Sequence, residues 1–174
     1  GSSTTLSSGT ITAKKYLWTQ LYSDATSNAV MRFNSDTGTN YARRGSVNGA
    51  SDFTVTSATG LSNLPSSNEA FGNAFIINNA SNEKLVISNA IDQNTAGAGN
   101  APNRLEVVGK WTNTSSQISN IKLMENNQAG GFTTGSNFPT LGSDGVEELN
   151  VQDGAVYYET DTNKEYVLYN NSWT

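Results

Sequence analysis

Apolar and polar residues follow each other along the chain in short runs that are broken by Gly, Asn, Asp and Ser. No stretch keeps the i, i+3, i+4, i+7 spacing of an amphipathic helix, whereas alternation with a period of two recurs. In the segment 15–22, Tyr16 and Trp18 fall on one face of an extended strand, and Leu17 and Leu21 fall on the other. The pattern predicts an all-β protein. The strands predicted after this one span residues 29–33, 41–44, 53–57, 74–77, 84–88, 104–111 and 118–124.

The spacing of these strands indicates how they are arranged. They recur at intervals of roughly 10 to 15 residues, which is typical of a sandwich or jelly roll and not of alternating strands and helices. We therefore predict a jelly-roll-like antiparallel β-sandwich with a C-terminal β-hairpin. The hairpin is indicated by two alternating segments, 155–160 and 165–169, that flank the turn residues 161–164.

The domain boundary is predicted from a breaker-rich stretch. Residues 133–143 are rich in Gly, Ser, Thr and Asn and contain Pro139, so we place the boundary near Gly142. A further strand is predicted at 146–151. The predicted organisation is a flexible N-terminal segment at 1–8, a β-sandwich domain at 9–142 and a C-terminal β-hairpin appendage at 143–174.

The amino-acid composition excludes several kinds of catalytic and metal-binding site. The chain of 174 residues contains no Cys and no His, which excludes disulfides, thiol nucleophiles, Cys/His zinc sites and His general bases. The carboxylates Glu147 and Glu148 are neighbours in sequence, and a strand directs neighbouring side chains to opposite faces, so they do not form a glycosidase pair. We therefore expect a protein that is not an enzyme. The 7 Tyr, 6 Phe and 3 Trp are sufficient for a folded hydrophobic core.

Charge and hydropathy each argue against one class of partner. Ten Lys and Arg against fifteen Asp and Glu give a net charge of −5, and no basic run occurs. Nucleic acid is therefore not an expected partner, because its binding needs clustered positive charge. No apolar run approaches the roughly 18 residues of a membrane span, so we expect no membrane insertion.

One segment has the spacing of a cation-binding loop. Asn34, Asp36 and Asn40 place oxygen ligands at even spacings around Gly38, as in loops that wrap a hard cation such as calcium. An EF-hand is excluded because its twelfth loop position, which needs a carboxylate, is Gly45. The alternative is a hairpin turn in which the Asn and Asp side chains bond their own backbone. Calcium is the only cofactor that the sequence suggests.

The aromatic residues fall into two groups. Trp18 and Trp111 lie inside predicted strands, and we expect them in the core. The aromatic residues of the C-terminal hairpin keep one face outward, so we expect them at a subunit interface or against a ligand, where such rings also stack on sugars. These candidate binding residues are Tyr157, Tyr158, Tyr166, Tyr169 and Trp173.

Several segments resemble a known class of proteins. The run 32–42, RFNSDTGTNYA, resembles a pattern in virion structural proteins of tailed bacteriophages and related viruses, in which it forms part of a β-sandwich surface domain. Residues 153–173 look like a hairpin common in phage tail, collar and fibre proteins, which are mostly trimeric. The segments that follow the first run in the same order as in that pattern are 46–49, 77–80, 84–86, 96–99 and 106–114.

This resemblance implies a location and a role. It implies a protein of the virion surface, either a capsid decoration or a component of a head or tail fibre, that forms a homo-oligomer, with a trimer favoured. Its partners would be other virion proteins. The alternative function is a receptor- or carbohydrate-binding module, an adhesin that contacts a glycan of the host surface.

Overall fold

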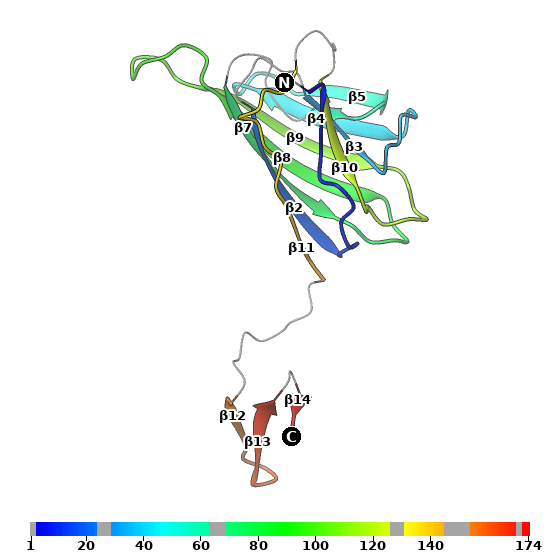
Figure 1. Cartoon of the computed structure of the whole chain (residues 1–174), viewed down its shortest axis with the longest axis vertical. Helices are drawn as coiled ribbons and strands as arrows, with labels where there is room; N and C mark the ends of the chain where they lie inside the picture. The colour runs from blue at the N-terminus through cyan, green and yellow to red at the C-terminus, as the bar shows by residue number, and fades with distance from the viewer. Residues whose placement is uncertain (1–2, 24–28, 63–68, 126–130, 145–153, 170–171) are drawn as a thin grey trace. The chain divides into compact units, whose positions relative to one another are not determined.

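The computed structural model describes residues 3–23, 29–62, 69–125, 131–144, 154–169 and 172–174. Within them every regular element is a β-strand and all pairing is antiparallel, which confirms the predicted fold class (Figure 1). The chain divides into two compact units, residues 1–144 and residues 145–174. The strands are β1 (Thr5–Ser7), β2 (Tyr16–Ser23), β3 (Ala29–Phe33), β4 (Tyr41–Val47), β5 (Phe53–Ala58), β6 (Leu61–Ser62), β7 (Ala70–Ile77), β8 (Lys84–Asp92), β9 (Asn103–Trp111), β10 (Ile121–Glu125), β11 (Thr140–Ser143), β12 (Val156–Glu159), β13 (Lys164–Tyr169) and β14 (Ser172–Trp173).

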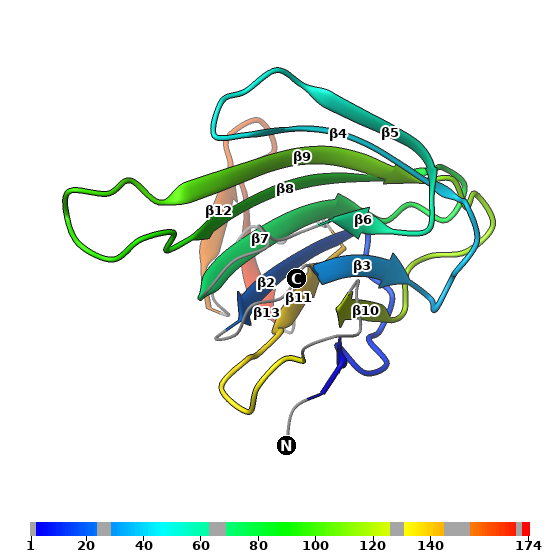
Figure 2. The ribbon, with the colours of Figure 1, turned by 90° about the horizontal axis from the view of Figure 1, so that it is seen from above.

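The first unit is a sandwich of two unequal sheets. The larger sheet has seven strands in the order β11-β2-β7-β8-β9-β4-β5, and the smaller has four in the order β1-β10-β3-β6. Seen from above, β3, β6 and β10 lie against one face of the larger sheet (Figure 2). We call this the inner face of the larger sheet, and the opposite one its outer face. The jelly-roll connection of the strands remains a prediction.

The core lies between the two sheets and follows from strict alternation. Along β2 and β8 every second residue is buried, as the period of two requires. An aromatic cluster fills one end of the core, where the rings of Phe33, Tyr41 and Trp111 have centroids 5.8 to 6.3 Å apart. The predicted core position of Trp111 is thus confirmed, since it is 2% exposed.

The N-terminal segment expected to be flexible contains a strand. Thr5–Ser7 form β1 and pair with β10, so that Leu6 lies opposite Leu123. Ser3 and Phe132 exchange two backbone hydrogen bonds of 2.7 and 2.9 Å. The sequence did not indicate this strand because Leu6 is its only large apolar residue and its partner strand is distant in the chain. Strands β6, β11 and β14 were not predicted either, and each is only two to four residues long.

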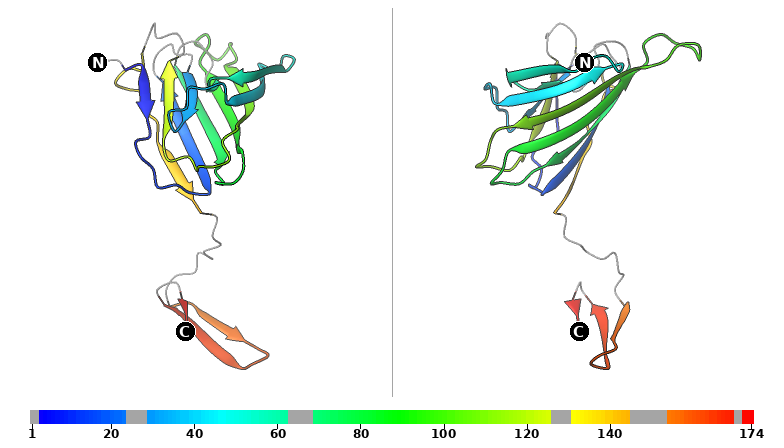
Figure 3. Two further views of the ribbon diagram at one scale, coloured as in Figure 1. Left: turned by 90° about the vertical axis from the view of Figure 1, so that its right-hand side faces the viewer. Right: turned by 180° about the vertical axis from the view of Figure 1, so that it is seen from behind.

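The second unit is a small three-stranded sheet of order β12-β13-β14 (Figure 3). Its first two strands form the predicted C-terminal hairpin, in which Tyr157 lies opposite Tyr166 and Val156 opposite Val167. Asn163 takes a φ of 53° in the turn, a conformation that Asn tolerates better than most residues. The strand predicted at 146–151 lies outside the described residues.

Candidate functional site

The segment with calcium-like spacing forms a hydrogen-bonded turn. Asp36 Oδ2 accepts hydrogen bonds from Trp111 Nε1 at 2.7 Å and from Asn40 Nδ2 at 2.9 Å, and Asp36 Oδ1 accepts one from the Gly38 amide at 2.8 Å. Burial raises the pKa of this carboxyl, but these three hydrogen bonds and the positive charge of Arg32 together outweigh it and hold the pKa below its ordinary value of 3.8. Both carboxylate oxygens therefore already have donors from the protein.

Asn34, the remaining predicted calcium ligand, points away from Asp36 and Asn40. Asn34 Oδ1 accepts hydrogen bonds from the amides of Ser119 and Asn120 at 2.9 and 3.2 Å, and Asn34 Nδ2 donates to Gln117 O at 2.9 Å. The structure thus brings Asp36 and Asn40 together but turns Asn34 toward the segment before β10. Within the described part of the chain, no group of three or more acidic, His or Cys side chains could hold a metal ion. Calcium binding at this turn remains a prediction.

A buried lysine lies next to Trp111, the residue that donates to Asp36. Lys84 is fully buried, and its Nζ donates hydrogen bonds to the carbonyl oxygens of Asn113 at 2.7 Å and Asn82 at 2.9 Å. The same ammonium lies 5.7 Å from the centre of the Trp111 ring, within the range of a cation–π contact. Burial lowers the pKa of Lys84. Residues of the segments 32–42, 84–86 and 106–114 therefore meet in space through these contacts.

The predicted binding residues of the hairpin lie on both faces of the small sheet. Tyr157 is 53% exposed and stacks on Tyr166, with ring centroids 6.3 Å apart. Tyr158 and Tyr169 lie on the opposite face and are 53% and 65% exposed. Trp173 lies in β14 opposite Leu168, and its side chain is outside the described residues. The structure therefore does not gather the four tyrosines into one site.

More than half of the exposed large apolar residues that the structure describes gather on one surface, which was not predicted. It lies on the outer face of the seven-stranded sheet, across β2, β7, β8 and β9, and we call it the outer apolar face. Trp18, expected in the core, lies on this side instead, where its half-buried ring stacks on Phe75 with centroids 5.9 Å apart. The outer apolar face consists of Tyr16, Phe71, Phe75, Ile77, Leu85, Ile87, Ile91 and Val108, each between 41% and 56% exposed.

Cross-strand register builds this face row by row. In one row, Phe75, Ile87 and Val108 are direct neighbours on adjacent strands. In the next row, Ile77 pairs with Leu85. Side chains directly opposite each other on antiparallel strands lie close enough to touch, so each row is a continuous apolar ridge.

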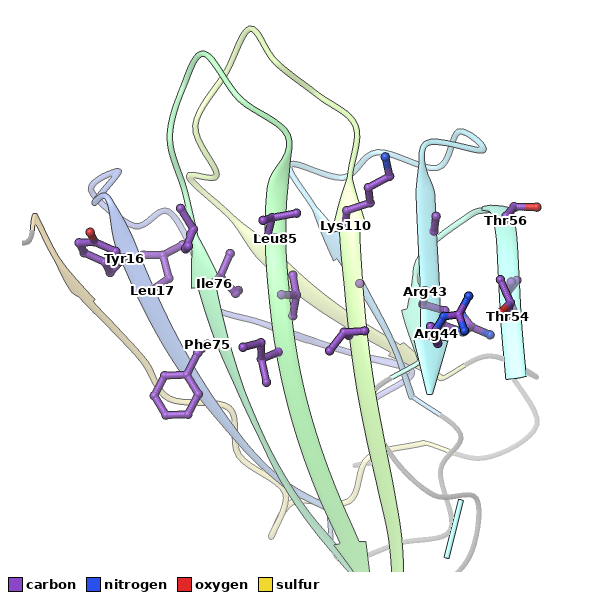
Figure 4. A pocket seen from close by; sticks show the side chains of 17 residues that line it. Tyr16, Leu17, Arg43, Arg44, Thr54, Thr56, Phe75, Ile76, Leu85 and Lys110 are labelled. Atoms are coloured by element: carbon purple, nitrogen blue, oxygen red, sulfur yellow. The ribbon is translucent and has the colours of Figure 1, made fainter. Parts of the chain in front are cut away.

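The face is hollowed into a trough with a volume of about 580 Å³. Figure 4 shows Tyr16 and Phe75 on one side of it and Arg44 and Thr54 on the other, with Leu85 between them. Most of the lining side chains are aliphatic or aromatic. The volume falls within the roughly 300 to 1,000 Å³ that is usual for binding sites.

Two apolar runs in the sequence could have indicated this exposed apolar face. Phe75 to Ile77 and Leu85 to Ile87 are each apolar at three consecutive positions. A strand with one solvated face alternates between apolar and polar residues, whereas a strand covered on both faces is apolar throughout. These two runs therefore indicate that both faces of the central strands are suited to burial.

Ion pairs border the outer apolar face. Lys110 Nζ lies 2.7 Å from Glu83 Oε2, and Arg44 Nη1 lies 3.7 Å from Asp52 Oδ2. A third pair joins Arg104 and Glu106 at 4.0 Å. These cations have carboxylates beside them, so the border carries no excess charge from the three pairs.

Comparisons with known proteins found no matching family model, no matching curated protein and no matching solved structure. Among the described residues, none belongs to a helix long and apolar enough to cross a bilayer.

Proposed function

We propose that the chain is a non-enzymatic structural protein of a virion surface, of the tailed-bacteriophage type, that serves as a capsid decoration or as part of a head or tail fibre. The observation that carries the proposal is the outer apolar face. An aromatic side chain presents about 150 to 250 Å² when free and an aliphatic one less, so the eight half-exposed residues present on the order of 600 to 800 Å² together. The largest apolar patch of a typical monomer is about 300 to 600 Å². Such an excess supports a role in protein–protein contact.

The second unit supports self-association. Its three strands leave Val156, Tyr158, Val167 and Tyr169 exposed on one face, at 57%, 53%, 42% and 65%. A sheet of this size buries too little apolar surface to be stable alone, and packing against other subunits would supply what is missing. The resemblance to phage fibre hairpins favours a homotrimer, and we propose that stoichiometry for contacts made by this unit. The other partners would be neighbouring virion proteins.

Carbohydrate binding is the weaker candidate. Tyr16 and Phe75 offer exposed rings at the trough, and such rings can stack on sugars. A glycan also needs several hydrogen-bond donors and acceptors, because its hydroxyl groups lose water on binding. The trough offers chiefly hydrocarbon, which suits an apolar protein surface better.

The test of the proposal is to locate the protein on particles. Antibodies raised against the chain are applied to purified virions of the phage that encodes it, and labelling is examined by electron microscopy. Regular surface labelling is the expected result. Label that stays in the particle-free fraction, together with specific binding on a glycan array, would favour the adhesin alternative without a virion role.

A further inference from the structure

We infer that the outer apolar face binds the same face of a second copy of this chain. This inference rests on the proposed function, because a structural protein of a particle surface works through contacts between subunits. It adds the partner and the surface, which the proposed function leaves open. Four observations lead to it: the size of the face, its charge, its shape and the pattern of its strands.

The size of the face matches the requirement of a stable pair. A standard interface takes about 800 Å² from each partner, and the outer apolar face exposes roughly that area. The exposure is contiguous, since Phe75, Ile87 and Val108 are neighbours in one row of the sheet. A small ligand in the trough would cover only part of it, and Phe71 and Ile91 lie outside the trough lining.

The charge of the face favours a copy of the same chain over a charged partner. The three bordering ion pairs contain Arg44, Arg104 and Lys110 with Asp52, Glu106 and Glu83, so these six charges sum to zero. The rest of the chain carries 7 basic and 12 acidic residues, which is 10 − 3 and 15 − 3 and leaves −5. Two acidic copies repel each other least where their surfaces are neutral. Apart from Lys15, whose ammonium lies 5.4 Å from the centre of the Tyr16 ring, a strongly charged partner would find little excess charge to pair with at this border.

The shape of the face permits reciprocal insertion. A two-fold axis brings the same patch of both subunits together, so a projection and a hollow on one patch meet the hollow and the projection on the other. Phe75 projects at one side of the trough and is 54% exposed. In such a pair, the Phe75 ring of each copy enters the trough of the other. Sheets packed face to face interdigitate in this way at a separation of about 10 Å.

The strand pattern is consistent with a face that becomes buried. Phe75 to Ile77 and Leu85 to Ile87 lack the alternation of strands with a solvated side. A second sheet laid over the outer face would give β7 and β8 apolar neighbours on both sides. The first units of the two copies would then form a stack of four sheets.

The experiment measures the mass of the full chain by light scattering over a dilution series. Ile87→Glu places a charge in the middle of the proposed contact, and the double variant Ile87→Thr with Val108→Thr keeps β-branched residues in the strands if the charged variant does not fold. Val47→Thr is the matched control, because Val47 is 44% exposed but lies opposite the buried Leu105, on the inner side of the same sheet. Val167→Glu tests the second unit independently.

The expected result is that the wild-type chain associates, that Val167→Glu alone leaves association through the outer apolar face, and that adding Ile87→Glu weakens this remaining association roughly a hundredfold or more, as for a central residue of an interface. Val47→Thr should leave the dissociation constant unchanged. Association that persists when each Ile87 variant is combined with Val167→Glu overturns the inference. Association that Val167→Glu alone abolishes also overturns it and leaves self-association through the second unit. A wild-type chain that stays monomeric but labels virions also overturns the inference while leaving the proposed function intact. A monomer that fails to label virions contradicts both.

Discussion

The indole nitrogen of Trp111 donates a 2.7 Å hydrogen bond to Asp36 Oδ2, and so joins the end of β9 to the turn between β3 and β4. The same indole ring lies beneath the ammonium of Lys84. One buried side chain is thus held by a carboxylate at its edge and by a cation at its face. Two segments that are far apart in the sequence, 32–42 and 106–114, are thus joined through this contact.

Removal of the Asp36 carboxylate should destabilise the fold. In Asp36→Ala the nearly buried Trp111 Nε1 loses its acceptor, and a lost bond to a charged group costs about 2 to 3 kcal/mol. Urea denaturation followed by tryptophan fluorescence measures the change. Asp36→Asn is the control, because it keeps an oxygen acceptor and should cost less. Equal stability of Asp36→Ala and the wild-type chain would show that the contact contributes nothing.

Acid should remove the contribution of Asp36. Its folded pKa lies below 3.8, so the folded state favours the carboxylate and gains stability at pH values above 3.8. This gain is lost as the pH falls through the folded pKa, because the carboxylate then protonates in both states. The difference in Tm between the wild-type chain and Asp36→Asn should therefore shrink below pH 3.8. A difference that stays constant down to pH 2 would contradict this assignment.

Alkali should destabilise the fold through Tyr41. Burial raises the pKa of Tyr41 from 10.0 to about 12, and its hydroxyl accepts a 3.0 Å hydrogen bond from the Phe33 amide. Between pH 10 and 12 the unfolded chain ionises at this position and the folded chain does not. The free energy of unfolding should therefore fall by about 3 kcal/mol over this interval. Tyr41→Phe should lack this part of the pH dependence, as measured by urea denaturation at each pH.

Lys84 should be essential to stability despite its charge. Lys84→Met keeps the length and apolar stem of the side chain but leaves the carbonyl oxygens of Asn82 and Asn113 without their donor, at a cost of about 2 to 4 kcal/mol. Thermal unfolding measures the loss. The control is Lys110→Met, since Lys110 is partly exposed and its pair with Glu83 should contribute less than about 1 kcal/mol.

The local sequence pattern predicted those strands and turns that are determined by residues close together in the chain. The alternation around Tyr16 and the turn at 161–164 were enough to predict β2 and the C-terminal hairpin. The bond between Asp36 and Trp111 joins residues that are 75 positions apart, so no local pattern encodes it. The outer apolar face was not predicted for a related reason: strands were predicted at 74–77 and 84–88, but which of their alternating side chains face inward depends on the second sheet, which the local pattern does not encode.

The pairing of β1 with β10 has a consequence for how the chain acquires its structure during synthesis. Ser7 lies opposite Lys122, and Tyr16 of β2 lies opposite Ile77 of β7. At a synthesis rate of roughly 5 to 20 residues per second, β1 leaves the ribosome on the order of ten seconds before its partner exists. The first strands must therefore wait unpaired, and the two sheets can close only near the end of translation. A topology with such distant partners belongs to the slowly folding class, with folding times of about milliseconds to seconds once the chain is complete.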